Sequence, residues 1–202
     1  MSIRNLRKRP PRRRRRSAEQ ARDEALAAAR AILLEKGPDA VTLKAVAAGI
    51  GMTHTNLLHH FGSAGELQSA LMGRMVRDLN VALGDAVAHL RSEEGAPRAL
   101  VDMVFDAFDK GGAGQLAAWI ALSGRQTQLE PIQRAVAELV NAIKDKFAGH
   151  SAEAHQGVTS AVLFIALCAF GDAIIGGPLV EMLGRERAAG RKITAHLLPR
   201  FF

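Results

Sequence analysis

Apolar residues recur at helical spacing along almost the whole chain, and no segment shows the alternation of apolar and polar residues that is typical of strands. The first helix is predicted to begin at a capping box, Ser17–Gln20, and to end at Gly37-Pro38. Leu26 and Leu33 belong to its apolar face. This pattern predicts an all-α protein.

Two short helices are expected next. Thr42 stands at the N-cap position of one and Thr53 at that of the other, and Gly51 lies between them. In the second short helix Leu57 and Phe61 are spaced i, i+4 and are expected to point inward. Two short helices joined by a glycine turn form a helix-turn-helix pattern.

A second capping box, Ser63–Glu66, opens a long helix that is expected to run to about Arg91. Glycine-containing breaks then separate five more helices, which brings the total to about nine. Their predicted ranges are about 96–109, 115–126, 130–149, 155–175 and 179–198. We expect an arm at 1–16, a helix-turn-helix domain at 17–65 and a helical domain at 66–202.

The charge of the chain is concentrated at its beginning. The net charge is +7, but residues 1–16 carry nine positive charges and no acid, which leaves −2 for the other 186 residues. The polar segment Ser17–Glu24 follows where a secretion signal needs an apolar stretch, so we reject export. A nuclear localisation signal and a solvated tail without a role remain alternatives. We favour an arm that binds nucleic acid, because contacts with phosphates release counterions.

The apolar run around Cys168 has two consequences. A single cysteine cannot form an intramolecular disulfide, so we expect a buried, inert thiol and a reducing compartment, the cytoplasm. The uninterrupted apolar stretch Ala161–Gly171 is shorter than the roughly 20 residues that a bilayer requires. We therefore expect no membrane segment here, and a helix 155–175 that is buried on nearly all sides.

The second short helix presents an outward face of hydrogen-bonding residues, namely His54, Thr55, Asn56, His59 and His60. Such a face suits base edges and phosphates in a major groove, since asparagine pairs bidentately with adenine and threonine contacts the thymine methyl group. A solvated helix face on an unrelated protein is the alternative. A metal site is not expected, because the spacing does not place three imidazoles around one ion.

Residues 22–67, "RDEALAAARAILLEKGPDAVTLKAVAAGIGMTHTNLLHHFGSAGEL", resemble the N-terminal DNA-binding domain of the TetR family of bacterial transcriptional regulators. The helix lengths, caps, glycines and "HHF" segment all occur at the spacing of that family. Two positions depart from it: Leu58 stands where tyrosine is usual, and Ala64 where lysine is usual. Both usual residues touch phosphates, so we hypothesise that the arginine-rich arm compensates.

The resemblance implies a cytoplasmic homodimer that binds a near-palindromic double-stranded DNA operator, is most often a repressor, and is released by a small-molecule effector. It requires no cofactor. The expected DNA-binding residues are Arg22, Thr42, Lys44, Thr53, His54, Thr55, Asn56, His59 and His60, with Arg12, Arg13, Arg14, Arg15 and Arg16 of the arm.

The other two sites are expected in the helical domain. Candidates for a largely apolar ligand pocket are Leu83, Val87, Met103, Phe105, Phe108, Trp119 and Gln126. The last helices are too apolar to face water, which independently favours a four-helix interface between two subunits. Its candidates are Val162, Ile165, Phe170, Ile174, Leu179, Met182 and Leu183.

Two other functions are alternatives to this one. A non-specific nucleic-acid-binding protein would rely on the arm and bind with steep salt dependence. An enzyme is disfavoured, because the sequence shows no nucleophile–base pattern, phosphate loop or metal motif. Asp102, Asp106 and Asp109 share one helix face, which we interpret as solvated acids.

Overall fold

The computed structural model describes residues 17–88, 96–124, 130–146 and 152–201, and these residues form helices without any strand. The helices are α1 (Ala18–Lys36), α2 (Leu43–Gly49), α3 (His54–Phe61), α4 (Ala64–Ala88), α5 (Ala96–Phe108), α6 (Ala113–Leu122), α7 (Glu130–Lys146), α8 (Ala152–Gly171), α9 (Gly177–Met182) and α10 (Ala189–Leu197). A π-helical turn, Asp172–Gly176, joins α8 to α9 without a break. Counted as continuous rods, the described residues therefore form nine helices, as the sequence predicts.

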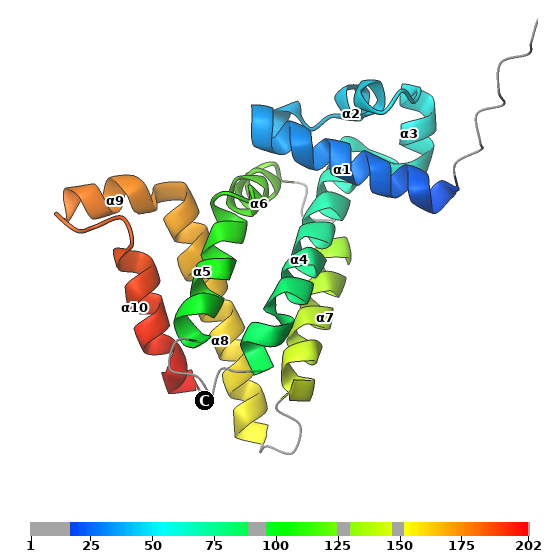
Figure 1. Cartoon of the computed structure of the whole chain (residues 1–202). Helices are drawn as coiled ribbons and strands as arrows, with labels where there is room; N and C mark the ends of the chain where they lie inside the picture. Colours follow the sequence, from blue (N-terminus) through cyan, green and yellow to red (C-terminus); the bar gives the residue numbers. More distant parts are fainter. Residues whose placement is uncertain (1–16, 89–95, 125–129, 147–151, 202) are drawn as a thin grey trace, which may run out of the picture.

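Helices α1, α2 and α3 form a three-helix unit that lies across one end of a helical bundle, and α4 runs from this unit into the bundle (Figure 1). Within the bundle α4 packs along α7 and against α5, while α10 packs against α5. A Cβ atom added at Gly73 of α4 would lie 2.6 Å from the carbonyl oxygen of Pro131 in α7. This close approach requires glycine at position 73.

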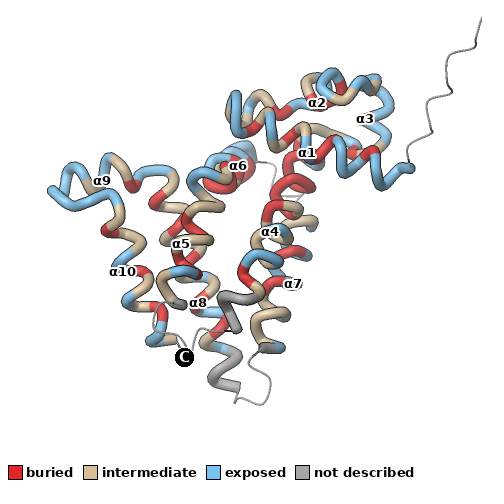
Figure 2. Tube along the Cα trace, in the orientation of Figure 1, coloured by how far each residue is buried: buried red, intermediate tan, exposed pale blue. Residues whose placement is uncertain are grey.

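Two apolar clusters fill the interior. The first contains Leu33, Leu57 and Phe61 of the three-helix unit with the beginning of α4, and the second contains Phe105 and Val158 in the bundle. Figure 2 shows the buried positions along the facing sides of these helices. Val76 of α4 and Phe108 of α5 pack against both clusters, so they connect the two parts of the molecule.

The predicted capping signals are confirmed at the starts of α1 and α4. Ser17 and Gln20 form a reciprocal capping box at α1. The hydroxyl of Ser63 accepts the amide N–H of Glu66 at 3.1 Å, which caps α4. The described part of α4 ends at Ala88, and the predicted continuation to Arg91 lies outside the described residues.

The predicted helix 179–198 is wrong as a single element. Helix α9 ends at Met182, Gly184 adopts a positive φ of 61°, and α10 begins only at Ala189. A left-handed residue ends a helix. The chain therefore reverses, and α10 runs back beside α5 (Figure 1).

The expectation that helix 155–175 is buried on nearly all sides is also wrong for the single chain. Val158, Ala161 and Ile165 face the second cluster, whereas Leu163 and Leu167 are 61% and 62% exposed. By length and composition, the continuous helix Gln156–Met182 is long and apolar enough to cross a membrane. The uninterrupted apolar stretch Ala161–Gly171 did not predict a helix of this length. The packing of this helix against α5 and α7 is that of a core helix with one uncovered face.

Candidate nucleic-acid interface and apolar cavity

Local hydrogen bonds cap the starts of α2 and α3. The hydroxyl of Thr42 accepts the N–H of Ala45 at 3.1 Å, and that of Thr53 accepts the N–H of Asn56 at 3.2 Å. Gly51 has a φ of 65°, a left-handed conformation that favours glycine. Both threonines thus act as N-caps, and each exposed hydroxyl keeps its proton for donation to another group.

Helix α3 turns one face inward and the other to solvent. Leu57 and Phe61 are buried in the first cluster. The side chains of α3 at the predicted contact positions His54, Thr55, Asn56 and His59 are exposed, whereas His60 is partly buried. Lys44 on α2 is exposed as well. The four exposed side chains His54, Thr55, Asn56 and His59 lie on one helix, and we call the surface that they form the α3 face.

Arg22 makes contacts within the protein itself, which a residue that only binds phosphate would not need. Its guanidinium donates a hydrogen bond to the backbone carbonyl of His60 and lies 4.3 Å from the centre of the Phe61 ring. The carbonyl groups at a helix C-terminus carry partial negative charge, which a cation stabilises. Arg22 consequently joins α1 to the end of α3 and orients the α3 face, a role that the sequence pattern does not reveal.

A chain of ion pairs fastens α1 to α4. Arg74 contacts Asp23 of α1 at 2.9 Å and Asp78 of its own helix at 3.0 Å, and Arg30 of α1 contacts Asp78 at 3.4 Å. The hydrogen bond to Asp78 raises the pKa of the Arg74 guanidinium above its ordinary value. These groups are close to half exposed, so they orient the two helices more than they stabilise the fold.

The two departures from the usual family pattern lie on α3 and at the start of α4. Leu58 is 39% exposed on α3, where it offers no hydrogen bond to a phosphate. Ala64 is the first residue of α4 and is partly buried. The predicted arm residues Arg12 to Arg16 lie outside the described residues.

A cavity of about 330 Å³ lies among α4, α5, α7 and α8, and it opens to the surface beside Thr159 and Leu163, which are exposed. Of the 18 described residues that line it, 17 are apolar and one, Thr159, carries a hydroxyl group. The volume is at the lower end of the range that small-molecule sites occupy. No acid, base or amide among the described lining residues faces this space, so it suits an uncharged molecule.

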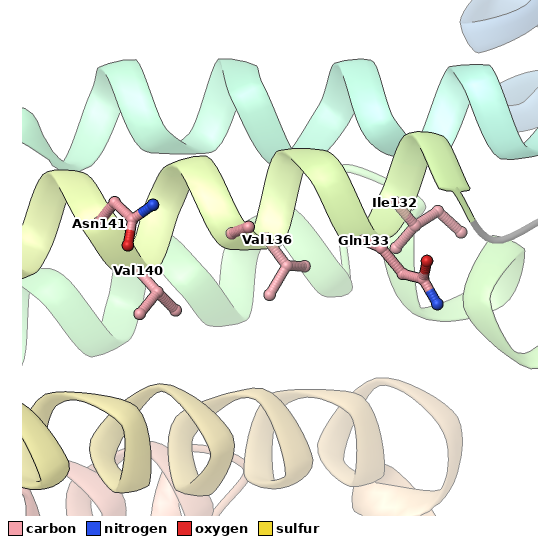
Figure 3. A pocket seen from close by; sticks show the side chains of 6 residues that line it. Ile132, Gln133, Val136, Val140 and Asn141 are labelled. Carbon is pink, nitrogen blue, oxygen red and sulfur yellow. The ribbon is translucent and has the colours of Figure 1, made fainter.

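A shallow groove on α7 adjoins the cavity. Figure 3 shows Gln133, Val136 and Val140 pointing from α7 toward α8. Val136 and Val140 line both the groove and the cavity. The amide of Gln133 therefore stands near the place where the cavity approaches the surface.

The predicted pocket residues are only partly brought together. Leu83 and Phe108 line the cavity, and Met103 lines a neighbouring groove between α4 and α5. Phe105 is not a pocket residue: it is 1% exposed within the second cluster, and its ring packs against Arg191. Trp119 is 40% exposed on α6. The side chain of Val87 and all of Gln126 lie outside the described residues.

The cavity walls on α7 and α8 were missed by the sequence analysis. Val136, Leu139, Val140 and Ile143 repeat at helical spacing on α7, the pattern of any core-facing helix. Their spacing gave no signal that the space in front of them is incompletely filled.

An uncovered apolar face extends along α8, the π-helical turn and α9. The large apolar side chains exposed on it are Leu163, Leu167, Ile174, Ile175, Leu179, Met182 and Leu183. Four of the seven predicted interface residues are among them. Ile165 is a correction, because it lies one turn from Ala161 on the buried side of α8. Val162 and Phe170 are partly buried, and Val162 lines the cavity.

The acids on α5 are paired rather than simply solvated. Arg191 of α10 lies 2.6 Å from Asp106, 3.7 Å from Asp102 and 3.8 Å from Asp109. The hydrogen bond from Arg191 holds the pKa of Asp106 below its ordinary value. The interpretation of these acids as a free acidic face is therefore wrong, and they attach α10 to α5.

Asp172 in the π-helical turn forms a second link. Its carboxylate accepts two hydrogen bonds from the guanidinium of Arg187, at 2.8 and 2.9 Å, and its side chain is only 7% exposed. A Cβ atom at Gly176 would lie 2.5 Å from this carboxylate. The link fixes the segment between α9 and α10. Within the described residues, no group of three or more potential ligands is placed to hold a metal ion.

Residues 25–71 match the model of the tetR family of bacterial regulatory proteins. Among solved structures, the fold matches a 1.54 Å crystal structure from Mesorhizobium loti MAFF303099, of a protein assigned to the TetR-family transcriptional regulators. The match has a TM-score of 0.60 and 16% sequence identity, and it covers 93% of this chain and 97% of that chain. A search of curated proteins finds no match. The match of residues 25–71 places the helix-turn-helix segment with the tetR family, and the match to the crystal structure shows that the chain as a whole shares that fold; together they support a DNA-binding transcriptional regulator.

Proposed function

We propose that the protein is a homodimeric repressor that reads a near-palindromic operator with α3 and is released by a small, largely apolar effector. The observation that carries this proposal is the α3 face. Its exposed side chains are short hydrogen-bonding groups, and the helix contains no acid that would repel phosphates. Leu57 and Phe61 anchor the helix, and Arg22 holds its C-terminal end, so the face is presented rigidly.

Each predicted contact residue has a role in this proposal. Asn56 and Thr55 read base edges in the major groove, as an amide and a methyl-bearing hydroxyl can. The imidazoles of α3 supply further hydrogen bonds to bases or phosphates. Lys44 and the hydroxyl groups of Thr42 and Thr53 bind phosphates beside the groove, where they set the register of the protein on the duplex.

The uncovered face of α8 and α9 supports a homodimer. Large exposed apolar patches on a soluble protein mark interaction sites. A twofold axis that pairs this face with the same face of a second subunit forms a four-helix interface. One dimer then presents two α3 helices, and each of them binds one of the two half-sites of the operator.

The proposed domains have separate roles. We assign DNA contacts to an arm at 1–16 and a domain at 17–65, and effector binding and dimerisation to 66–202. Helix α4 starts at Ala64 and passes from one domain into the other. We place the protein in the bacterial cytoplasm, on the nucleoid when it is bound to DNA, and assign it no cofactor and no catalytic role.

One alternative is favoured by a specific observation. Helix α3, "HTNLLHHF", has neither lysine nor arginine, while the arm has nine positive charges in 16 residues. A protein whose affinity comes mostly from such an arm binds nucleic acid without sequence preference. Leu58 and Ala64 support this alternative, because both lack the phosphate-binding groups that are usual at their positions.

The experiment that separates the two functions is selection from a random duplex library with the full chain at about physiological salt. A repressor is expected to enrich a near-palindrome. N56A is expected to lose preference at one position of each half-site, whereas N141A, the same substitution on the exposed side of α7, keeps the selected sequence. If the protein retains DNA without enriching any sequence, and if this retention disappears as the salt concentration rises, the non-specific alternative is established.

A further inference from the structure

Helix α3 carries no permanent charge on its side chains. Its sequence, HTNLLHHF, contains neither lysine nor arginine, and it contains no acid. Its histidines are therefore the side chains of α3 whose charge can change, and histidine is the residue type that ordinarily titrates between about pH 5 and 8. The charge that this helix presents to DNA consequently depends on how many of its imidazoles hold a second proton.

The three histidines stand at different ends of the helix. His54 is the first residue of α3, whereas His59 and His60 belong to its last turn. Amide N–H groups give the N-terminus of a helix a partial positive charge, and carbonyl groups give its C-terminus a partial negative charge. A protonated imidazole is thus disfavoured at position 54 and favoured at positions 59 and 60.

Of the two histidines in the last turn, His59 is the better place for a proton. The ring centres of His59 and His60 lie 6.2 Å apart, so two imidazolium groups would repel each other. His60 is partly buried, and the guanidinium of Arg22 already places a positive charge at its backbone carbonyl. His59 is exposed, so its protonated form remains in contact with water.

His59 also points away from the protein. It lies two positions after the buried Leu57 and two before the buried Phe61, and two positions correspond to about 200° around a helix. Its imidazole is therefore on the side of α3 opposite the first cluster. In helix-turn-helix proteins the N-terminal residues of the recognition helix contact base edges. The last turn, which contains His59, is then available for the phosphates.

The elements packed against α3 contribute charges that do not change near neutral pH. These are Glu19, Arg22, Asp23 and Glu24 in the first two turns of α1, Lys44 on α2 and Glu66 in the first turn of α4. The carboxylate of Glu66 lies against Gly62, directly after α3, where it favours a cation in the last turn. Carboxylates, lysine and arginine ordinarily keep their charge between about pH 6 and about pH 7.5. A change in DNA affinity over this range therefore reports on imidazole.

We propose that His59 binds an operator phosphate as an imidazolium cation, so that DNA binding takes up a proton and strengthens as pH falls. Both ring nitrogens of an imidazolium donate hydrogen bonds, whereas a neutral imidazole has one donor and one acceptor. The phosphate favours the protonated form, and by linkage protonation favours the phosphate by the same factor. The inference rests on the proposed function and adds a dependence on pH to it. A complex held by the arginines of the arm alone has no such dependence, because arginine stays charged.

The experiment compares the affinity of the full chain for the selected duplex at about pH 6 and about pH 7.5, at one salt concentration. An imidazole whose protonated form the phosphate favours about 10-fold contributes about 4-fold over this range. For the wild type we expect binding that is at least about 5-fold tighter at the lower pH, since a dimer has two such imidazoles. H59Q keeps a neutral hydrogen-bonding side chain and is expected to reduce this ratio to less than about 2-fold.

Matched controls are available on the same helix and outside the DNA-binding unit. H54Q removes the histidine at the opposite end of α3, and H196Q removes an exposed histidine on α10. Both variants are expected to keep the wild-type ratio. H59K carries a permanent positive charge, so its affinity is expected to change by less than about 2-fold between the two pH values.

Salt dependence gives a readout that a structural role of His59 would not move. In the wild type the slope of log K against log salt is expected to be steeper at the lower pH, by about 0.9 for each His59 that neutralises a phosphate. In H59Q the two slopes are expected to be equal. Slopes that are also equal in the wild type would refute the phosphate contact.

Equal wild-type affinities at the two pH values, or an H59Q protein that keeps the wild-type ratio, would overturn the role of His59. In both cases the duplex is still bound specifically, so the proposed repressor stands. If the library selection yields no sequence at either pH, the proposed function fails, and this inference fails with it. The two failures are therefore distinguishable.

Discussion

The link between Asp172 and Arg187 leads to a sharp prediction about stability. The substitution D172N keeps the size of the side chain, removes its negative charge and replaces one acceptor oxygen by an NH2 group. In the native protein both carboxylate oxygens accept hydrogen bonds from Arg187, and the side chain is 7% exposed. The amide NH2 group of the variant would face another donor at this site.

The magnitude follows from the burial of each partner. Breaking a fully buried ion pair costs about 3–5 kcal/mol, and losing a hydrogen bond to a charged group costs about 1.5–3 kcal/mol. Asp172 is buried, but the side chain of Arg187 is 50% exposed and can regain water. We therefore expect a loss of about 2 kcal/mol in the free energy of unfolding, which lowers the melting temperature by about 4–8 °C for a chain of this size.

The assay is thermal and urea unfolding, followed by circular dichroism at one fixed protein concentration, because association affects the apparent stability. E186Q is the matched control: Glu186 pairs with Lys192 beside the same link, but both side chains are more than half exposed. E186Q is expected to leave the midpoint unchanged. If D172N also unfolds at the wild-type midpoint, the Asp172–Arg187 link does not hold the α9–α10 segment, and the reasoning fails.

Three further outcomes are expected. M182D, at a side chain that is 80% exposed, should give monomers in sedimentation velocity with unchanged helical content; a persistent dimer would place the interface elsewhere. Removal of residues 2–16 should make the dependence of log K on log salt shallower by about 0.9 for each phosphate that the arm neutralises, and an unchanged slope would show that the arm does not bind. Because the pKa of Asp106 is depressed by Arg191, its contribution to stability is complete above the ordinary value of 3.8 and is lost as pH falls below it. In D106N the unfolding midpoint should therefore change less with pH in this acid range than it does in the wild type. An equal change in both proteins would refute the assignment.

Features that depend on neighbouring residues were predictable from the sequence. Ser17, Thr42 and Thr53 cap their helices because each hydroxyl meets an amide three residues further along the chain. The inward face of α3 follows from the i, i+4 spacing of Leu57 and Phe61. The helix-turn-helix unit and its outward face were therefore recognisable before any tertiary contact was known.

Features that join distant segments were not predictable in the same way. Arg22 is predicted to bind DNA, and nothing in the sequence pattern indicated that its guanidinium also donates a hydrogen bond to a carbonyl group 38 residues away at the end of α3. Asp106 was interpreted as solvated, yet it pairs with Arg191, which is 85 residues away. An acidic side chain has the same local sequence pattern whether its partner is water or an arginine, so only the tertiary structure decides between them.

The sequence by itself determined the helical class, the helix-turn-helix unit, the arginine-rich arm and the apolar character of the last helices, because helix periodicity, capping and charge are properties of short segments. The tertiary structure decided which apolar side chains are core, cavity wall or uncovered face. Ile165 and Leu163 are two residues apart in one apolar run, yet one is buried and the other is exposed. Burial depends on which helices pack on each side of α8, and that arrangement arises from contacts between segments far apart in the chain.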